Sequence, residues 1–434
     1  MSGLNNQFRK LAGAKASRGF KSLRFRLNFN LQINMYHPSK KILEKYADVL
    51  VNFALNSGGG VKRGEVVLLQ VPESAKPMLL ELHKAVLKSG AHPIIQYLPD
   101  DGMSREFFNF ANKEQISFFP AKYLKGKIDE IDHSIFMIAD TDKHELEGID
   151  PKLIMEKSKV MKPYMDWRDQ KESAGKFTWT LGLYGTKAGA DEVGMSEKEY
   201  WQEIIKACYL NDKNPVKTWK KIESEIERVK NKLDALKIEK VRIESKNTDL
   251  TVVLGKNRKW MGGSGRNIPS FEVFISPDCR YTEGYISFNQ PLYRYGNLIK
   301  DIYLEFKNGK VVKATAKKGE KILKHMIANT NANMIGEFSL TDGRISKITK
   351  FMAETLFDEN MGGKYGNTHI ALGSAYKDSY PGDPNKVPKS QWAKMGYNES
   401  VVHTDIISTE DRMVTAWLPN GKTLVIYKDG KFTV

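Results

Sequence analysis

Hydrophobic residues in the first half of the chain follow the pattern of alternating helices and strands. Apolar side chains recur at helical spacing from Ile42 to Leu55, which predicts a helix. A buried-strand run at Val66 to Val71, an amphipathic helix over Ser74 to Lys88 and a second strand at Pro93 to Leu98 form a βαβ unit. Such units build parallel sheets, and a further buried strand is predicted at Ile135 to Ala139. The N-terminal part is therefore predicted to be a doubly wound α/β domain.

Two helices are predicted between Met195 and Leu236. The second carries an apolar stripe at spacings of three and four, which is typical of core packing or a subunit contact: Trp219, Ile222, Ile226, Val229, Leu233 and Leu236. This region marks the predicted boundary between an N-terminal domain, 35–237, and a C-terminal domain, 238–434. Three glycines at 58–60 precede the first strand instead of following it, so they predict a turn and not a dinucleotide site.

Beyond Lys240 the pattern changes to short alternating strands, which favours a strand-rich α+β domain. Strands are predicted at 241–245, 250–254, 272–275 and 285–288, with a hairpin at 302–316 whose tip is Asn308-Gly309. Helical spacing predicts helices at Glu320 to Asn329 and at Ile345 to Leu356. A last strand-like run covers Val401 to Ser408.

The charge of the chain changes this interpretation little. The 434 residues carry a formal charge of +16, and residues 1–34, with seven basic residues and no acid, supply +7 of it. We interpret this segment as a disordered N-terminal extension, with a targeting arm as the alternative. The other lysines alternate with glutamates along helices, which is typical of solvated faces, so nucleic acid is not an expected partner. No run reaches the roughly 18–20 apolar residues that cross a membrane, and a soluble, cytoplasmic protein is expected.

Candidate metal ligands must come from oxygen and nitrogen atoms, because the chain has only two cysteines. His403 and Asp405 lie two residues apart in a strand and so project from one face. His369 has Ala371 and Gly373 on its own face, which leaves space beside the ring. The other six histidines are predicted to be surface or hydrogen-bonded residues: His37, His83, His92, His133, His144 and His325.

Two acids stand among apolar neighbours, Glu272 in a predicted strand and Glu337 after a glycine, and a third acid, Glu359, follows a helix. Buried carboxylates are costly unless they are paired or bind metal. Together with Asp405 and the two histidines they could supply about eight bonds to two metal ions if two acids bridge. Their four negative charges would balance two divalent ions, which activate water for amide hydrolysis.

These residues resemble those of the aminopeptidase T family, thermophilic-type metallo-aminopeptidases that include aminopeptidase S. The resemblance runs from about Met35 to the C-terminus and includes residues 176–208. Its most specific stretches are NIPSFEVFISP at 267–277, IGEF at 335–338, LFDEN at 356–360, HIALGSAY at 369–376 and NESVVHTD at 398–405.

The resemblance implies a pair of zinc, cobalt or manganese ions, with Glu272, Glu337 and His369 at one ion and Glu359 and His403 at the other. Glu337 and Asp405 would bridge, and Tyr376 matches the active-site tyrosine. It also implies a homodimer whose active sites face an internal cavity and act on peptides.

Two positions depart from the family pattern. Phe271 stands where glycine is common, and the segment Met361 to Thr368 is longer than usual. Two alternatives stay open: a two-metal phosphoesterase, which would need a basic cluster that the sequence lacks, and a non-catalytic basic binding protein with a degenerate metal site. The sequence does not indicate the side-chain specificity, the general base or the group that binds the substrate amine.

Overall fold

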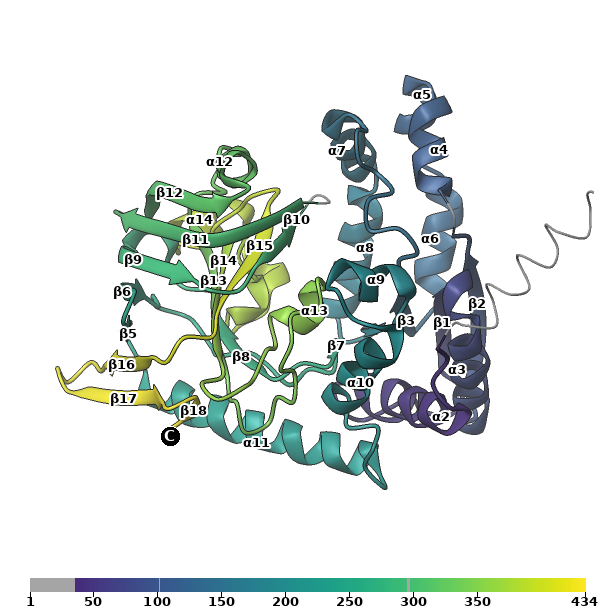
Figure 1. Ribbon diagram of the computed structural model, residues 1–434, viewed down its shortest axis with the longest axis horizontal. Coiled ribbons are helices and arrows are strands. Elements are labelled where there is room, and N and C mark those ends of the chain that lie inside the picture. The colour runs from purple at the N-terminus through teal and green to yellow at the C-terminus, as the bar shows by residue number, and fades with distance from the viewer. Residues whose placement is uncertain (1–35, 101, 295–296) are drawn as a thin grey trace, which may run out of the picture. The chain divides into compact units, whose positions relative to one another are not determined.

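The apolar runs of the first half form a parallel sheet in the order β2, β1, β3, β4, β7 (Figure 1). The structure, a computed structural model, describes residues 36–100, 102–294 and 297–434. The strands are β1 (Val66–Pro72), β2 (His92–Leu98), β3 (His133–Ile138), β4 (Thr178–Leu183) and β7 (Asn267–Ile268). The first three confirm the predicted strands. The predicted extension, residues 1–34, lies outside the described residues, and the domain division at 237/238 stays a prediction.

In the strand order, the chain moves from β1 to β2 in one direction and from β2 to β3 in the other. Because crossovers between parallel strands are right-handed, these two connections place their helices on opposite faces of the sheet. Leu68 of β1 packs with Ile128, Ile131 and Phe177 in one buried cluster. The helices of this part are α2 (Lys40–Val49), η1 (Leu50–Ala54), η2 (Glu73–Ala75), α3 (Lys76–Lys88), α4 (Met103–Phe110), α5 (Lys113–Ser117), α6 (Ala121–Glu130), α7 (Pro151–Val160), α8 (Lys162–Ser173) and α9 (Lys187–Glu192). The predicted helix at 42–55 is thus α2 continued by η1, and the predicted doubly wound arrangement is confirmed. Among the described residues, no helix is long and apolar enough to cross a membrane.

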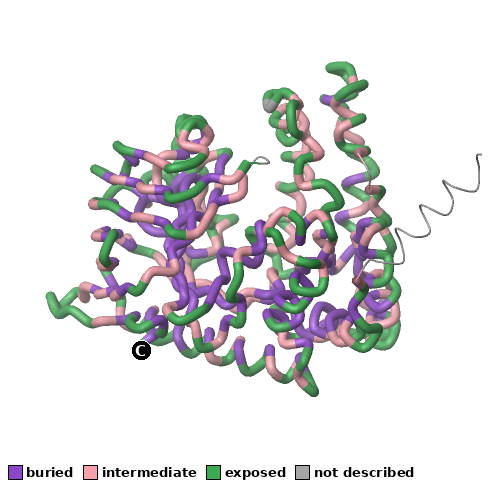
Figure 2. Tube along the Cα trace, viewed as in Figure 1, coloured by how far each residue is buried: buried purple, intermediate pink, exposed green. Residues whose placement is uncertain are grey.

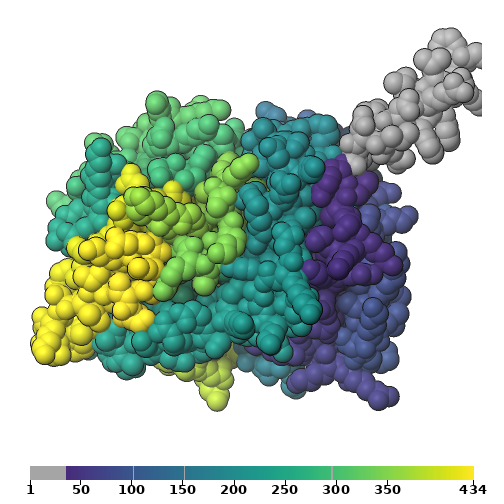
Figure 3. Space-filling view, turned by 60° about the horizontal axis from the view of Figure 1, so that its bottom comes forward, coloured from purple at the N-terminus to yellow at the C-terminus, as the bar shows by residue number. Residues whose placement is uncertain are grey.

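The two predicted helices before residue 237 are α10 (Glu197–Ala207) and α11 (Pro215–Leu236). Five of the six apolar residues of the α11 stripe are buried, which confirms the core-packing interpretation. Arg228 of α11 donates from Nη1 to the carbonyl oxygen of Val434 at 3.1 Å. The C-terminal strands consequently lie beside α11 (Figures 1 and 3).

The second half contains a large antiparallel sheet in the order β10, β11, β9, β6, β5, β16, β17, β18, with β12 paired to β11. Its strands are β5 (Lys240–Ser245), β6 (Thr248–Val253), β9 (Glu283–Phe288), β10 (Leu292–Arg294), β11 (Asn297–Lys307), β12 (Lys310–Lys318), β16 (Met413–Trp417), β17 (Thr423–Lys428) and β18 (Lys431–Phe432). The hairpin with Asn308-Gly309 at its tip and the helix after it, α12 (Glu320–Ile327), are confirmed. Short helices are η3 (Cys279–Tyr281), η4 (Lys377–Ser379), η5 (Pro384–Lys386) and α14 (Lys389–Lys394).

A four-stranded antiparallel sheet lies at the centre of the second half, in the order β15, β14, β13, β8. Its strands are β8 (Glu272–Ile275), β13 (Ile335–Thr341), β14 (Asn367–Gly373) and β15 (His403–Ser408). Every residue of β13 and β14 is buried, and Figure 2 shows this sheet as a buried column. This sheet carries five of the six predicted ligands.

The helix predicted at Ile345 to Leu356 is wrong. The segment is irregular, and only α13 (Thr355–Asp358) is helical. Four of its apolar residues, Ile348, Met352, Ala353 and Leu356, are buried, but Ala353 adopts a positive φ of 49°, which an α-helix does not allow. The Asp358 carboxylate instead accepts bonds from the amides of Met352 and Glu354, at 2.7 and 2.9 Å. Side-chain hydrogen bonding therefore overrides the helical spacing.

Candidate metal centre

Strand register brings the predicted ligands to one face of the four-stranded sheet. Glu337 of β13 pairs with Ala371 of β14, and Ala371 pairs with Asp405 of β15. Residues paired across strands point to the same face, and so do residues two apart along a strand. His369 lies two residues before Ala371, and His403 lies two residues before Asp405, so both imidazoles point to the same face as the two carboxylates. The small Ala371 side chain leaves space between the two carboxylates.

Five side chains form a continuous series of short contacts, with Glu337 in the middle. His369 Nε2 lies 3.1 Å from Glu337 Oε1 and 3.3 Å from Glu272 Oε2. On the other side, His403 Nε2 lies 3.6 Å from Glu337 Oε2 and 3.5 Å from Asp405 Oδ1. Glu337 thus faces both histidines with its two oxygens.

Two groups of possible ligands result, each with its ligand atoms within 4.8 Å of one another. One group contains Glu272, Glu337 and His369, and the other contains Glu337, His403 and Asp405. Glu337 belongs to both. In the described part of the chain these are the groups of three or more acids, histidines and cysteines that could hold a metal ion.

Glu359 lies next to these groups without belonging to either. It follows α13, and its Oε1 accepts bonds from the amides of Asn267 and Asn360, both at 3.3 Å. Burial raises the pKa of Glu359 well above its usual range, and repulsion from Glu272 and Asp405 adds to the shift. Because Glu272 and Asp405 belong to different groups, the Glu359 carboxylate lies close enough to both groups to interact with their charges.

The titration of the cluster reflects the burial of opposite charges side by side. Burial is the main cause that raises the pKa of Glu337. The His369 imidazole lowers this pKa and the carboxylates of Glu272 and Asp405 raise it, so that it lies at about 7. Burial would lower the pKa of His403, but Asp405 and Glu337 raise it to about 9. Burial would likewise raise the pKa of Asp405, but the His403 imidazole lowers it to about 2. Perturbed groups gathered in this way are typical of functional sites.

Both histidines have the orientation that a metal ligand needs. His369 Nδ1 lies 3.1 Å from the carbonyl oxygen of Glu359, and His403 Nδ1 lies 2.8 Å from that of Ser374. A carbonyl oxygen only accepts, so each Nδ1 carries a hydrogen, and each Nε2 is the atom that faces the carboxylates and can bind a metal ion once it is deprotonated. Metal-bound histidines are commonly fixed by such a bond. The oxygen and nitrogen donors of this face therefore fit divalent cations.

Comparison with known proteins agrees with this geometry. The chain matches the family described as thermophilic metalloprotease (M29) over residues 39–432. The protein is a member of that family. Membership in the M29 family makes it a metal-dependent peptide hydrolase, and it confirms the resemblance found in the sequence motifs.

Several relatives are named aminopeptidases. The chain is 29% identical to aminopeptidase PepS of Streptococcus thermophilus, over 91% of this chain and 98% of that one. It is 26% identical to aminopeptidase T of Thermus thermophilus, over 91% of this chain and 99% of that one. The solved structure of wild-type AmpT from Thermus thermophilus has a TM-score of 0.78 at 24% identity and covers 91% of this chain and 100% of that chain. This likeness confirms the mixed α/β fold.

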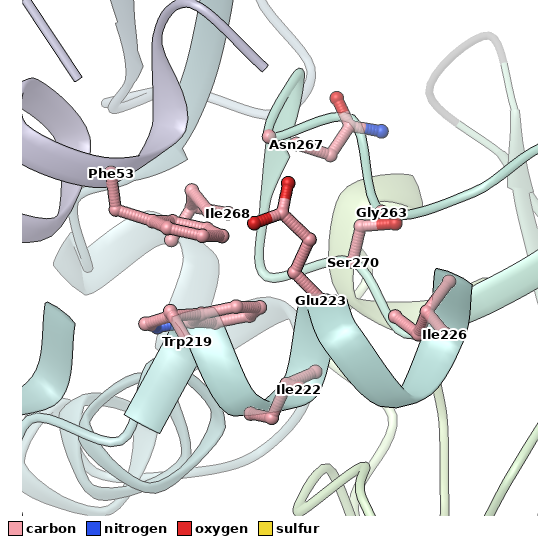
Figure 4. A pocket seen from close by; sticks show the side chains of 10 residues that line it. Phe53, Trp219, Ile222, Glu223, Ile226, Gly263, Asn267, Ile268 and Ser270 are labelled. Carbon is pink, nitrogen blue, oxygen red and sulfur yellow. The ribbon is translucent and has the colours of Figure 1, made fainter. Parts of the chain in front are cut away.

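Phe271, the first position predicted to depart from the family pattern, is part of an aromatic stack. Its ring is fully buried and lies 5.3 Å from the ring of Trp219, at an angle of 10°. Trp219 in turn stacks on Phe53 at 5.7 Å. Figure 4 shows Phe53 and Trp219 in the wall of a small pocket, with Glu223 and Asn267 on its other side. The stack supports the segment that leads into Glu272.

The segment Met361 to Thr368, which is predicted to be longer than usual, does not separate Glu359 from His369, because His369 Nδ1 lies 3.1 Å from the carbonyl oxygen of Glu359. Asn367 donates from Nδ2 to the carbonyl oxygens of Glu359 and Met361, at 3.0 and 2.6 Å. Residues 363–365 of this segment form a turn, and the Tyr427 hydroxyl lies 3.1 Å from the carbonyl oxygen of Tyr365.

Tyr376 lies at the open side of the cluster. Its ring centroid is 4.8 Å from that of His403 and 5.7 Å from that of Phe274, and the residue is 44% exposed. Burial raises the pKa of the Tyr376 phenol well above its usual range, and Glu337 and Asp405 add to the shift, so the hydroxyl lies near the acids of the cluster while other atoms of the residue are exposed. One neighbour was not predicted from the sequence: Arg294 donates from Nη2 to the carbonyl oxygen of His403 at 3.2 Å and lowers the pKa of Asp405. A single arginine at the end of a short strand gives no sequence signal.

The remaining described histidines are hydrogen-bonded or away from the cluster, as expected. His133 is buried and contacts Glu65 at 2.9 Å and Thr178 at 2.8 Å. His144 pairs with Glu192 at 3.0 Å.

Proposed function

We propose that this protein is an aminopeptidase that releases N-terminal amino acids from peptides with water activated at a dinuclear divalent-metal site. The observation that carries the proposal is the position of Glu337, whose two oxygens face two separate ligand groups. A shared carboxylate of this kind is typical of two-metal hydrolases. The aminopeptidase names of the relatives support peptides as the substrate class.

In this proposal Glu272 and His369 bind one ion, Glu359 and His403 bind the other, and Glu337 and Asp405 bridge them. The Glu359 carboxylate accepts hydrogen bonds from the side-chain amides of Asn267 and Asn360 and contacts neither imidazole. It would therefore have to shift toward an ion in order to bind it. When bound, two divalent ions would polarise the scissile carbonyl and lower the pKa of a water molecule.

The chain's own groups complete the chemistry. The carbonyl oxygens of Glu359 and Ser374 keep the imidazoles of His369 and His403 oriented. Tyr376 reaches the open side, where its phenol can donate a hydrogen bond to the oxyanion of the tetrahedral intermediate.

The direct test is metal analysis of the purified protein together with chelation and reconstitution with zinc, cobalt or manganese, assayed on aminoacyl nitroanilides. We expect two ions per chain, loss of activity on chelation and no cleavage of N-acetylated substrates. Glu337→Ala should lose metal and activity together. Full activity of this variant would refute the assignment of Glu337.

We further propose a homodimer, since the resemblance to the aminopeptidase T family implies one. Analytical ultracentrifugation of the full chain tests it, and a monomer at the concentrations that support full activity would contradict it.

A further inference from the structure

A buried lysine in the first half of the chain contacts the segment that carries Glu359. Lys143 lies in the loop after β3, and only 8% of its side chain is exposed. Its Nζ is 2.9 Å from Glu354 Oε2 and 2.9 Å from Asp140 Oδ2. The Glu354 side chain is 14% exposed, whereas that of Asp140 is 50% exposed. Of the two ion pairs, the one between Lys143 and Glu354 is therefore shielded from solvent.

Glu354 is the start of a tightly bonded turn that ends at Glu359. The carbonyl oxygen of Glu354 accepts from the amides of Phe357 and Asp358, both at 2.9 Å, and so begins α13. The Asp358 carboxylate accepts from the amides of Met352 and Glu354. The amide of Glu359 donates in turn to the carbonyl oxygen of Thr355 at 3.0 Å, so a continuous set of hydrogen bonds connects Glu354 with Glu359. A displacement of Glu354 would therefore move Glu359.

The same loop also touches the other side of the site. The hydroxyl of Tyr293 donates to the carbonyl oxygen of Lys143 at 3.0 Å. The next residue, Arg294, donates to the carbonyl oxygen of His403. Lys143 thus lies between the turn that carries Glu359 and the strand that supports His403, the two residues assigned above to one ion.

Removing a buried lysine would leave the Glu354 carboxylate without its cation. Breaking a shielded ion pair from one side is costly because the remaining charge has lost both water and partner. Glu354 would turn toward solvent, and the bonded turn would follow it. The loss would therefore reach Glu359 and not only the stability of the fold.

We propose that Lys143 is a positioning residue, which through Glu354 holds Glu359 at the distance where it can share an ion with His403. This inference rests on the proposed dinuclear site. It goes beyond it by assigning to a residue of the N-terminal α/β part a role in metal binding.

The experiment compares the full chain with Lys143→Met, Lys143→Arg, Glu354→Gln, Glu359→Gln and the double variant Lys143→Met/Glu359→Gln. The matched control is Lys84→Met on α3, because Lys84 also pairs with a buried glutamate, Glu81, at 3.0 Å. Metal affinity is measured by chelator competition with zinc, and unfolding is followed separately. Loss of a group that orients a metal ligand typically costs about 10- to 100-fold in affinity.

We expect Lys143→Met and Glu354→Gln to weaken one of the two ions by about 10- to 100-fold, Lys143→Arg to restore part of the affinity, and Lys84→Met to match the wild type. The double variant should bind no more weakly than Glu359→Gln alone, since both changes act on one ligand. Wild-type affinity in both Lys143→Met and Glu354→Gln, or full additivity in the double variant, overturns the role of Lys143. If the wild type binds no ion, the proposed function itself is wrong and this inference falls with it.

Discussion

Replacing Phe271 by glycine should destabilise this protein strongly. The ring has no exposed surface, and it stacks on Trp219 and meets Tyr209 at 6.2 Å. Its backbone is not in the left-handed region, so glycine gains no conformational advantage there. The perturbation therefore removes packing without relieving strain.

The expected cost follows from two terms. Truncating a buried phenylalanine costs about 3–5 kcal/mol, because the cavity only partly collapses. Glycine adds roughly 0.5–1 kcal/mol of backbone entropy relative to alanine. The lost aromatic pair is already included in the first term, so we expect about 3.5–6 kcal/mol in total, a large part of the roughly 5–15 kcal/mol by which a typical fold is stable.

Urea denaturation followed by tryptophan fluorescence measures this cost. With a slope of about 3 kcal/mol per molar urea, 4 kcal/mol shifts the midpoint by about 1.3 M, and a steeper slope in a larger chain gives a smaller shift. Leu80→Ala on α3 is the control, since Leu80 is 56% exposed, and should change stability by less than about 0.5 kcal/mol. A cost below about 1.5 kcal/mol for Phe271→Gly, within the range of volume-conserving core changes, would refute the role of the stack.

Further outcomes are expected from the site itself. Chelation should lower the melting temperature, because ions at 100 times their Kd stabilise a fold by about 2.7 kcal/mol; an unchanged melting temperature in scanning fluorimetry would contradict tight binding. Tyr376→Phe should lower kcat by about 10²–10³ with unchanged metal content, the usual loss of an oxyanion donor, and a wild-type kcat would exclude that role. His83→Ala should change neither metal content nor kcat, and a loss of either would show that a site residue was overlooked.

The strands could be predicted from the sequence because their apolar residues repeat over short distances. Of the four-stranded sheet, β8 and β15 are predicted in this way, whereas β13 and β14, in which every residue is buried, are not assigned as strands. The candidate ligands could be named for the same reason: acids and histidines stand out in such runs. Ordered family motifs then linked residues that lie far apart along the chain.

Features that depend on long-range contacts could not be predicted. The spacing at 345–356 is helical, yet Asp358 and Ala353 hold the segment in an irregular turn. Lys143 and Glu354 meet across 211 positions, and neither has a motif. β7 has only two residues, and its pairing with β4 leaves no periodic signal.

The short β7 strand has a consequence for exchanging parts between related enzymes. Residues 267–268 extend a sheet that the first half of the chain builds, and Arg266 just before them binds Glu172 and Asp378, both at 2.7 Å. A chimaera joined near residue 237 would combine a β4 edge from one parent with a β7 from another. Such grafts should succeed only when β4, β7 and the residues that Arg266 binds are transferred together, so the two halves of this protein should be exchanged as a matched set and not as independent modules.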